Sequence, residues 1–60
     1  ADEELALARQ AEAIESRMVI AALKAERITI FKLLRGRKIG SETARKLVRE
    51  LDLMEARYEA

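Results

Sequence analysis

Apolar side chains recur along the first half of the chain at the spacing of one helical face. The steps between successive members alternate between four and three residues, a pattern typical of a helix that buries one stripe against a neighbouring helix. The members are Leu7, Ala11, Ile14, Met18, Ala21, Ala25 and Ile28. A second apolar edge follows Met18 and is formed by Val19, Ile20, Leu23, Ile30, Phe31, Leu33 and Leu34. We therefore predict a long helix over about residues 3–34, with neighbours on more than one side of its second half.

The two glycines of the chain lie directly after this segment and indicate a turn. Gly36 is expected in the left-handed conformation that often follows a helix. Asp2 is the predicted N-cap of the first helix, and Ser41 that of a second helix over about residues 42–58, with Ile39 packing inward. The apolar face of this second helix comprises Ala44, Leu47, Val48, Leu51, Met54 and Tyr58. The sequence thus predicts a single all-α module over residues 1–60, a helical hairpin with a basic turn at residues 35–41.

The two predicted helices differ in length, at roughly 50 Å and roughly 25 Å. Folding back about the turn is expected to bring Tyr58 near Met18 and Leu51 near Ala25. The remaining half of the long helix keeps an alanine-rich apolar stripe without intrachain cover, where we expect a second copy to dock and form a homodimer of bundle character. The expected interface residues are Leu7, Ala11, Ile14 and Met18.

Charge is distributed unevenly along a chain with 12 basic and 11 acidic side chains. Acids outnumber bases over residues 1–26, whereas residues 32–49 carry many basic side chains and a single acid, Glu42. The turn is therefore a basic end, which could bind phosphate of anionic lipid or of nucleic acid, or could simply complement two helix termini. The candidate anion or lipid contacts are Arg35, Arg37, Lys38 and Arg45. Nucleic acid is the less favoured partner, because a helix-turn-helix reader needs a supporting third helix.

The chain contains neither His nor Cys. Acid–base or nucleophilic catalysis would then depend on carboxylates or lysines, which occur here where helix caps and solvated faces place them. We therefore expect no enzyme activity, no cofactor and no metal site. A 60-residue chain without a disulfide or a metal is also marginal on its own, which favours association with a partner.

Three segments resemble the extreme C-terminal cytoplasmic tail of bacterial sodium/proton antiporters of the cation:proton antiporter-1 type. They are residues 27–34, 39–42 and 49–57, and the distinctive part is the Leu51-Asp52-Leu53 core at its distance from the turn. The resemblance covers roughly the last thirty-five residues and implies a non-catalytic dimerisation or regulatory module at the cytoplasmic face of the bacterial inner membrane. It also implies the membrane domain of a parent protein as a partner. The alternative is a small free-standing helical dimer that binds nucleic acid through the basic turn.

Overall fold

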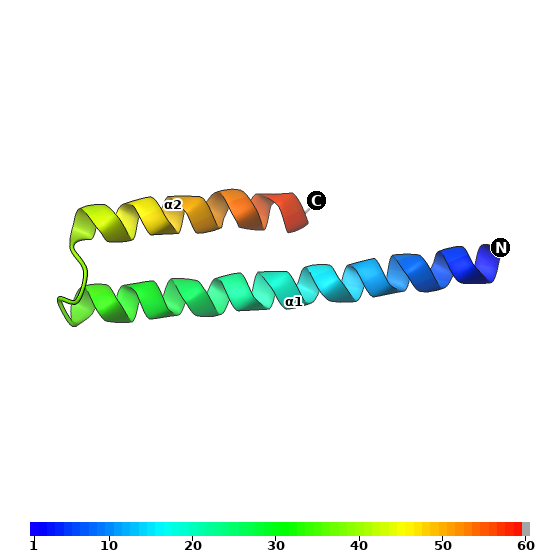
Figure 1. The fold of residues 1–60 in the computed structure, drawn as a ribbon, viewed down its shortest axis with the longest axis horizontal. Helices are drawn as coiled ribbons and strands as arrows, with labels where there is room; N and C mark the ends of the chain where they lie inside the picture. The colour runs from blue at the N-terminus through cyan, green and yellow to red at the C-terminus, as the bar shows by residue number, and fades with distance from the viewer. Residues whose placement is uncertain (60) are drawn as a thin grey trace.

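The protein consists of two antiparallel α-helices joined by a short turn (Figure 1). The computed structural model describes residues 1–59, in which α1 spans Asp2–Arg35 and α2 spans Ser41–Tyr58. The predicted all-α hairpin of one long and one short helix is confirmed. The Cα atoms extend over 54 × 16 × 10 Å, so the molecule is a rod. Because α1 has 34 residues and α2 has 18, α1 continues well beyond the end of α2 (Figure 1).

α1 ends in a Schellman turn in which Arg37, rather than Gly36, takes the left-handed conformation. Gly36 has a φ of −78° and Arg37 a φ of 56°. The N–H of Arg37 donates to the Leu34 carbonyl at 3.1 Å, and that of Lys38 donates to the Leu33 carbonyl at 2.8 Å, which are the two bonds of this motif. The prediction for Gly36 is therefore wrong, because α1 runs one residue further than expected and Gly36 becomes its capping residue.

Neither helix begins with a side-chain cap. Ala1 precedes α1 and Gly40 precedes α2, and no side-chain hydrogen bond caps either of these two helices. The predicted N-caps, Asp2 and Ser41, are instead the first residues of their helices, so both predictions are wrong. The carbonyl of the residue before each helix already accepts an intrahelical bond, which moves each start one residue towards the N-terminus.

The hydrophobic core lies between the two helices, over the length of α2. Among residues 1–59, the buried apolar side chains are Leu23, Ile30, Ala44 and Leu51. Packed against them are the partly buried Val19, Leu34, Ile39, Leu47 and Val48. Ile39 packs inward from the turn as predicted, whereas Met54 and Tyr58 at the far end of α2 stay exposed.

α1 packs on α2 through its second apolar edge and not through the stripe that begins at Leu7. We call the α1 residues buried or half-buried at this spacing the covered face: Ser16, Ile20, Leu23, Arg27, Ile30 and Leu34. At 3.6 residues per turn this face points roughly opposite to the stripe. The predicted contacts of Tyr58 with Met18 and of Leu51 with Ala25 are therefore wrong, since Met18 and Ala25 are exposed on the far side. Over the length of α2, the covered face carries more large aliphatic side chains than the stripe does.

Candidate functional site

An apolar stripe runs along the side of α1 that faces away from α2, and we call it the exposed stripe. Its members are the predicted interface residues Leu7, Ala11, Ile14 and Met18, continued by Ala21, Ala25 and Ile28. The large side chains are markedly exposed, with Leu7 at 64%, Ile14 at 44%, Met18 at 67% and Ile28 at 57%. Contiguous exposed apolar surface of this kind marks an interaction site more often than isolated apolar residues do. The structure thus brings all four predicted residues onto one surface, which extends beyond them to Ile28.

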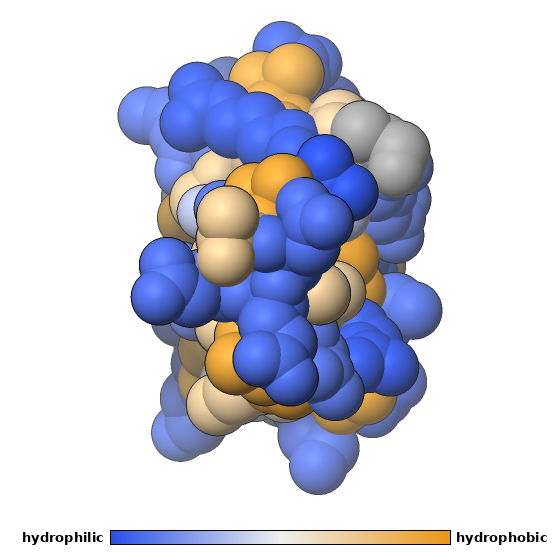
Figure 2. Space-filling view, turned by 90° about the vertical axis from the view of Figure 1, so that its right-hand side faces the viewer, coloured by the Kyte–Doolittle hydropathy of each residue, from blue (hydrophilic) through white to orange (hydrophobic). Residues whose placement is uncertain are grey.

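A shallow depression runs along one edge of the exposed stripe. It has a volume of about 510 Å³ and is lined by the stripe residues Ala11, Ile14 and Met18 and by their neighbours Glu15, Val19 and Ala22. The alanines leave room between the larger side chains, so that side chains of a neighbouring helix can enter. Figure 2 views the molecule from the end where α1 begins and shows hydrophobic residues between hydrophilic ones along its lower part, which is the side of α1 away from α2.

The exposed stripe ends in charges of opposite sign. Continuing its spacing by one step towards the N-terminus reaches Glu4, and continuing it towards the bend reaches Lys32 and then Arg35. All three side chains are exposed. The apolar stripe therefore has an acidic end and a basic end, which are separated by about 42–46 Å of helix.

Arg27 connects the two helices in the centre of the covered face. Its Nη2 lies 2.6 Å from Oδ1 of Asp52 and 2.9 Å from Oε2 of Glu55. Hydrogen bonding to Asp52 raises the pKa of Arg27 above its ordinary value, and the charges of both carboxylates act in the same direction. Asp52 is largely exposed whereas Glu55 is half-buried, so the contact to Glu55 is the better shielded from solvent. The guanidinium thereby joins α2 to α1 at the level of Asp52 and Glu55.

Sequence reasoning missed this ion pair. The available signal was an acidic pair three residues apart, Asp52 and Glu55, flanking the apolar face of α2, with Arg27 at a covered position between Leu23 and Ile30. Without knowledge of which face of α1 meets α2, that signal could not be assigned to a cross-helix contact.

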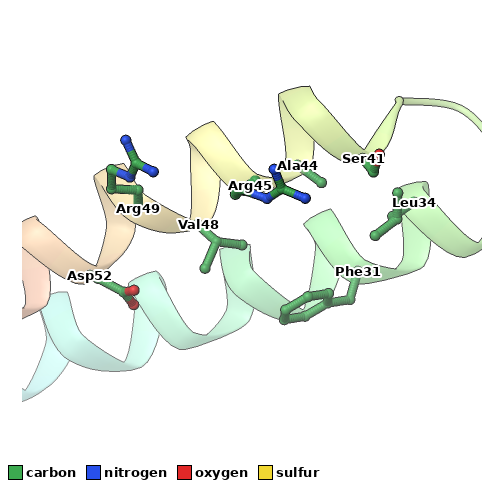
Figure 3. Close-up of a pocket in the computed structure, with 8 residues that line it drawn as sticks. All are labelled: Phe31, Leu34, Ser41, Ala44, Arg45, Val48, Arg49 and Asp52. Carbon is green, nitrogen blue, oxygen red and sulfur yellow. The ribbon is translucent and has the colours of Figure 1, made fainter.

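The predicted anion-contact residues are divided between the turn and α2. Arg35, Arg37 and Lys38 are exposed at the end of α1 and in the turn. Arg45 lies on α2 beside Arg49, and both line a hollow of about 460 Å³ between the helices. In this hollow Phe31 lies below Val48, which points toward α1, while Arg49 points away from it (Figure 3).

The backbone of the turn at the end of α1 is used up by its own hydrogen bonds. The N–H groups of Gly36, Arg37 and Lys38 all donate to carbonyls of the last turn of α1. These three N–H groups are therefore not available to a phosphate, which would be held beside them by flexible arginine and lysine side chains. Such contacts are sensitive to salt and carry little stereochemical selectivity.

Two kinds of feature were not found among the described residues. Neither α1 nor α2 contains a stretch long and apolar enough to cross a membrane. No group of three or more acidic, histidine or cysteine side chains within residues 1–59 is arranged to hold a metal ion.

Comparison with known proteins gives one informative similarity. The chain is 45% identical over 47 residues to the uncharacterized Na(+)/H(+) exchanger YjcE of Escherichia coli (strain K12). The similar segment spans 78% of this chain and 9% of that exchanger. No family model and no solved structure matches the chain. The similarity supports a relationship to a sodium/proton antiporter, of which this chain corresponds to a small part.

Proposed function

We propose that the chain is a non-catalytic segment of a membrane sodium/proton antiporter, forming a C-terminal cytoplasmic tail that mediates association or regulation. Two lines support the antiporter relationship: the similarity to an Na(+)/H(+) exchanger and the resemblance carried by the Leu51-Asp52-Leu53 core. The observation that carries an association role is the exposed stripe on the side of α1 opposite α2. On this proposal the membrane domain of the parent protein carries the ions, and the hairpin lies at the cytoplasmic face of the same bilayer.

The hairpin alone has little apolar burial to hold it together. Four buried side chains form its core, among the residues that the structure describes, while four large ones of the exposed stripe remain in water. Fully burying a Leu, Ile or Met side chain contributes about 1.5–3 kcal/mol. The four large side chains of the exposed stripe are 44–67% exposed, so covering them would add roughly half of that for each. We therefore assign the exposed stripe to a homodimer interface that includes Leu7, Ala11, Ile14 and Met18.

Two residues of similar exposure test this assignment. Met18 lies on the exposed stripe and is 67% exposed, and Leu53 lies on the outer side of α2 and is 64% exposed. Sedimentation equilibrium over a concentration series should give a dimer for the wild type and for Leu53→Glu, and a monomer for Met18→Glu. Equal effects of the two substitutions, or a monomeric wild type at all concentrations, would contradict the homodimer.

The antiporter relationship is tested in cells of the source organism. An antibody raised against the 60-residue chain should detect a membrane-fraction protein far larger than the chain itself. Sodium-driven proton movement in everted vesicles should then change when Met18→Glu is introduced into that protein, and should not change with Leu53→Glu. A small soluble antigen would overturn the tail assignment, and unaltered transport would overturn the regulatory role.

The basic end is assigned to contact with anionic lipid at the membrane surface. Clustered cations next to a bilayer gain about 1 kcal/mol per residue near an anionic surface. The chain should co-sediment with vesicles containing one third phosphatidylglycerol and not with pure phosphatidylcholine vesicles. Reversing Arg35, Arg37, Lys38 and Arg45 to Glu should abolish the binding, whereas unchanged binding would remove lipid from the proposal.

A further inference from the structure

We propose that two copies of the chain pair antiparallel through the exposed stripe, with Met18 of one copy opposite Ala21 of the other. The inference rests on the homodimer of the proposed function and adds the orientation and register. Nothing in α2 obstructs it, because α2 lies on the opposite side of α1. The pair would place the two α1 helices at the centre and the two α2 helices outside.

The order of large and small residues in the exposed stripe favours this orientation. Steps of three and four residues alternate along the exposed stripe. In an antiparallel pair, each residue that is followed by a step of three faces a residue of the other copy that is followed by a step of four. Every layer of the interface therefore joins two different positions of the stripe. In the register we propose, the numbers of two facing residues add to 39, so the layers are Ala11 with Ile28, Ile14 with Ala25 and Met18 with Ala21. Each layer therefore joins one large side chain to one alanine, so that the volume is evenly filled along the interface.

A parallel, in-register pair would fill the same interface unevenly. Each residue would then face its own copy, with alanine on alanine at Ala11, Ala21 and Ala25 and large on large at Ile14 and Met18. Helices held apart by the large layers leave voids at the alanine layers, and unfilled volume in an apolar interface is destabilising. An antiparallel pair shifted by one heptad, so that facing numbers add to 32, is also unevenly filled. It places Ile14 of one copy on Met18 of the other and Ala11 of one copy on Ala21 of the other.

Charge at the two ends of the exposed stripe points to the same register. In this register Glu4 of one copy lies opposite Arg35 of the other. Lys32 of one copy lies against Leu7 of the other, and the methylene stem of the lysine can cover this leucine. A parallel pair would instead bring Glu4 to Glu4 and Arg35 to Arg35, and like charges at facing positions are destabilising. The exposed stripe is thus complementary to its own reversed copy in both size and charge, which is why a second copy is the favoured occupant.

Distance measurement between spin labels distinguishes the two orientations. The chain has no Cys, so a single introduced Cys can be labelled without removing a native one. Ala6 lies at an exposed position outside the stripe, and in the antiparallel pair the two Ala6→Cys sites would be separated by 27 residues of rise, roughly 40 Å. In a parallel pair they would lie within roughly 20 Å, the width of two neighbouring helices with their labels.

A label at Lys24→Cys serves as the matched control on the same side of α1. The antiparallel pair separates the two Lys24 sites by roughly 14 Å along the axis, and a parallel pair also keeps them close. We expect a long distance from residue 6 and a short one from residue 24. Short distances from both sites overturn the antiparallel inference while leaving the homodimer intact, and a monomer in both samples overturns the homodimer as well.

Salt provides a second readout that needs no substitution. Raising NaCl from about 20 to 200 mM screens the acid–base pairs at the ends of the antiparallel pair, so the dissociation constant should rise about two-fold to five-fold. A parallel pair with like charges at its ends should tighten instead. Tightening over this range would overturn the inference. Neither readout depends on the antiporter relationship, so failure here and failure of the membrane assignment are separate results.

Discussion

The two faces of α1 share one spacing of residues but differ in exposure. The covered face and the exposed stripe both alternate steps of three and four residues, yet α2 lies on the first and leaves the second in water. The covered face carries a charge at its centre, Arg27, which Asp52 and Glu55 of α2 match. The exposed stripe has charges only at its ends, with alanines between its large residues. Spacing thus indicates that a helix has an apolar face, while the side chains on that face indicate whether α2 packs on it.

The largest expected effect comes from opening the covered face. Leu51 is 3% exposed in a core with few other buried residues, so Leu51→Ala should lower the free energy of unfolding by about 2–4 kcal/mol. Urea unfolding followed by circular dichroism at 222 nm measures the change. Leu53→Ala, in the same helix but on its outer side, should cost under about 0.5 kcal/mol. Equal losses would mean that α2 does not bury the face assigned to it.

A smaller effect follows from reversing the charge at the centre of the covered face. Arg27→Glu places a third carboxylate beside Asp52 and Glu55, so we expect a lower midpoint of thermal unfolding. Replacing both acids by Lys in the same chain should recover most of that loss. Arg17→Glu, an exposed position on another side of α1, is the control and should leave the midpoint nearly unchanged. A midpoint insensitive to Arg27→Glu would show that the ion pair does not stabilise the hairpin.

The turn offers a gain in stability of moderate size. Arg37 has a φ of 56°, a conformation that glycine adopts without a steric penalty, so Arg37→Gly should raise the free energy of unfolding by about 0.5–1 kcal/mol. Arg37→Ala removes the same charge without relieving the backbone and should give no such gain. The comparison is made by thermal unfolding at one ionic strength. A gain from Ala equal to that from Gly would assign the effect to charge.

The exposed stripe should give the smallest effect on the monomer. Met18 is 67% exposed, so Met18→Glu should change the free energy of unfolding by under about 0.5 kcal/mol when the protein is dilute. At high concentration the wild type should gain stability through association, and the variant should not. A loss of stability in dilute solution would place Met18 in the intrachain core and contradict the separation of the two faces.

The hairpin was predictable because its signals are local. Helical spacing, the two glycines and the gap between the apolar segments specify two helices and a reversal, and all of these are properties of neighbouring residues. The exact helix ends were not predictable. When the end of α1 shifts by one residue, Gly36 moves from the left-handed position to the capping position, and Arg37 takes the left-handed conformation instead. Local sequence permits both arrangements, and hydrogen bonding across the whole turn selects one.

The choice between the two faces of α1 was not predictable in the same way. The stripe from Leu7 to Ile28 has the longer and more regular repeat, which favoured it as the intrachain contact. α2 reaches only to about Ser16, however, and over that length the covered face offers the larger aliphatic side chains, Leu23 and Ile30 among them. A sequence pattern counts apolar positions over the full helix, whereas packing depends on the volume available where the second helix lies.

The part of α1 that extends beyond α2 is held in helical form by its own backbone bonds and receives no intrachain packing. A segment of about fourteen residues is near the length at which an isolated helix is marginal in water. Amide hydrogens in solution should therefore exchange progressively faster from Ser16 towards Asp2, and the gradient should flatten when a partner covers the exposed stripe. On the homodimer proposal, the uncovered half of α1 would therefore be the part of the interface whose backbone gains most order when the second copy binds.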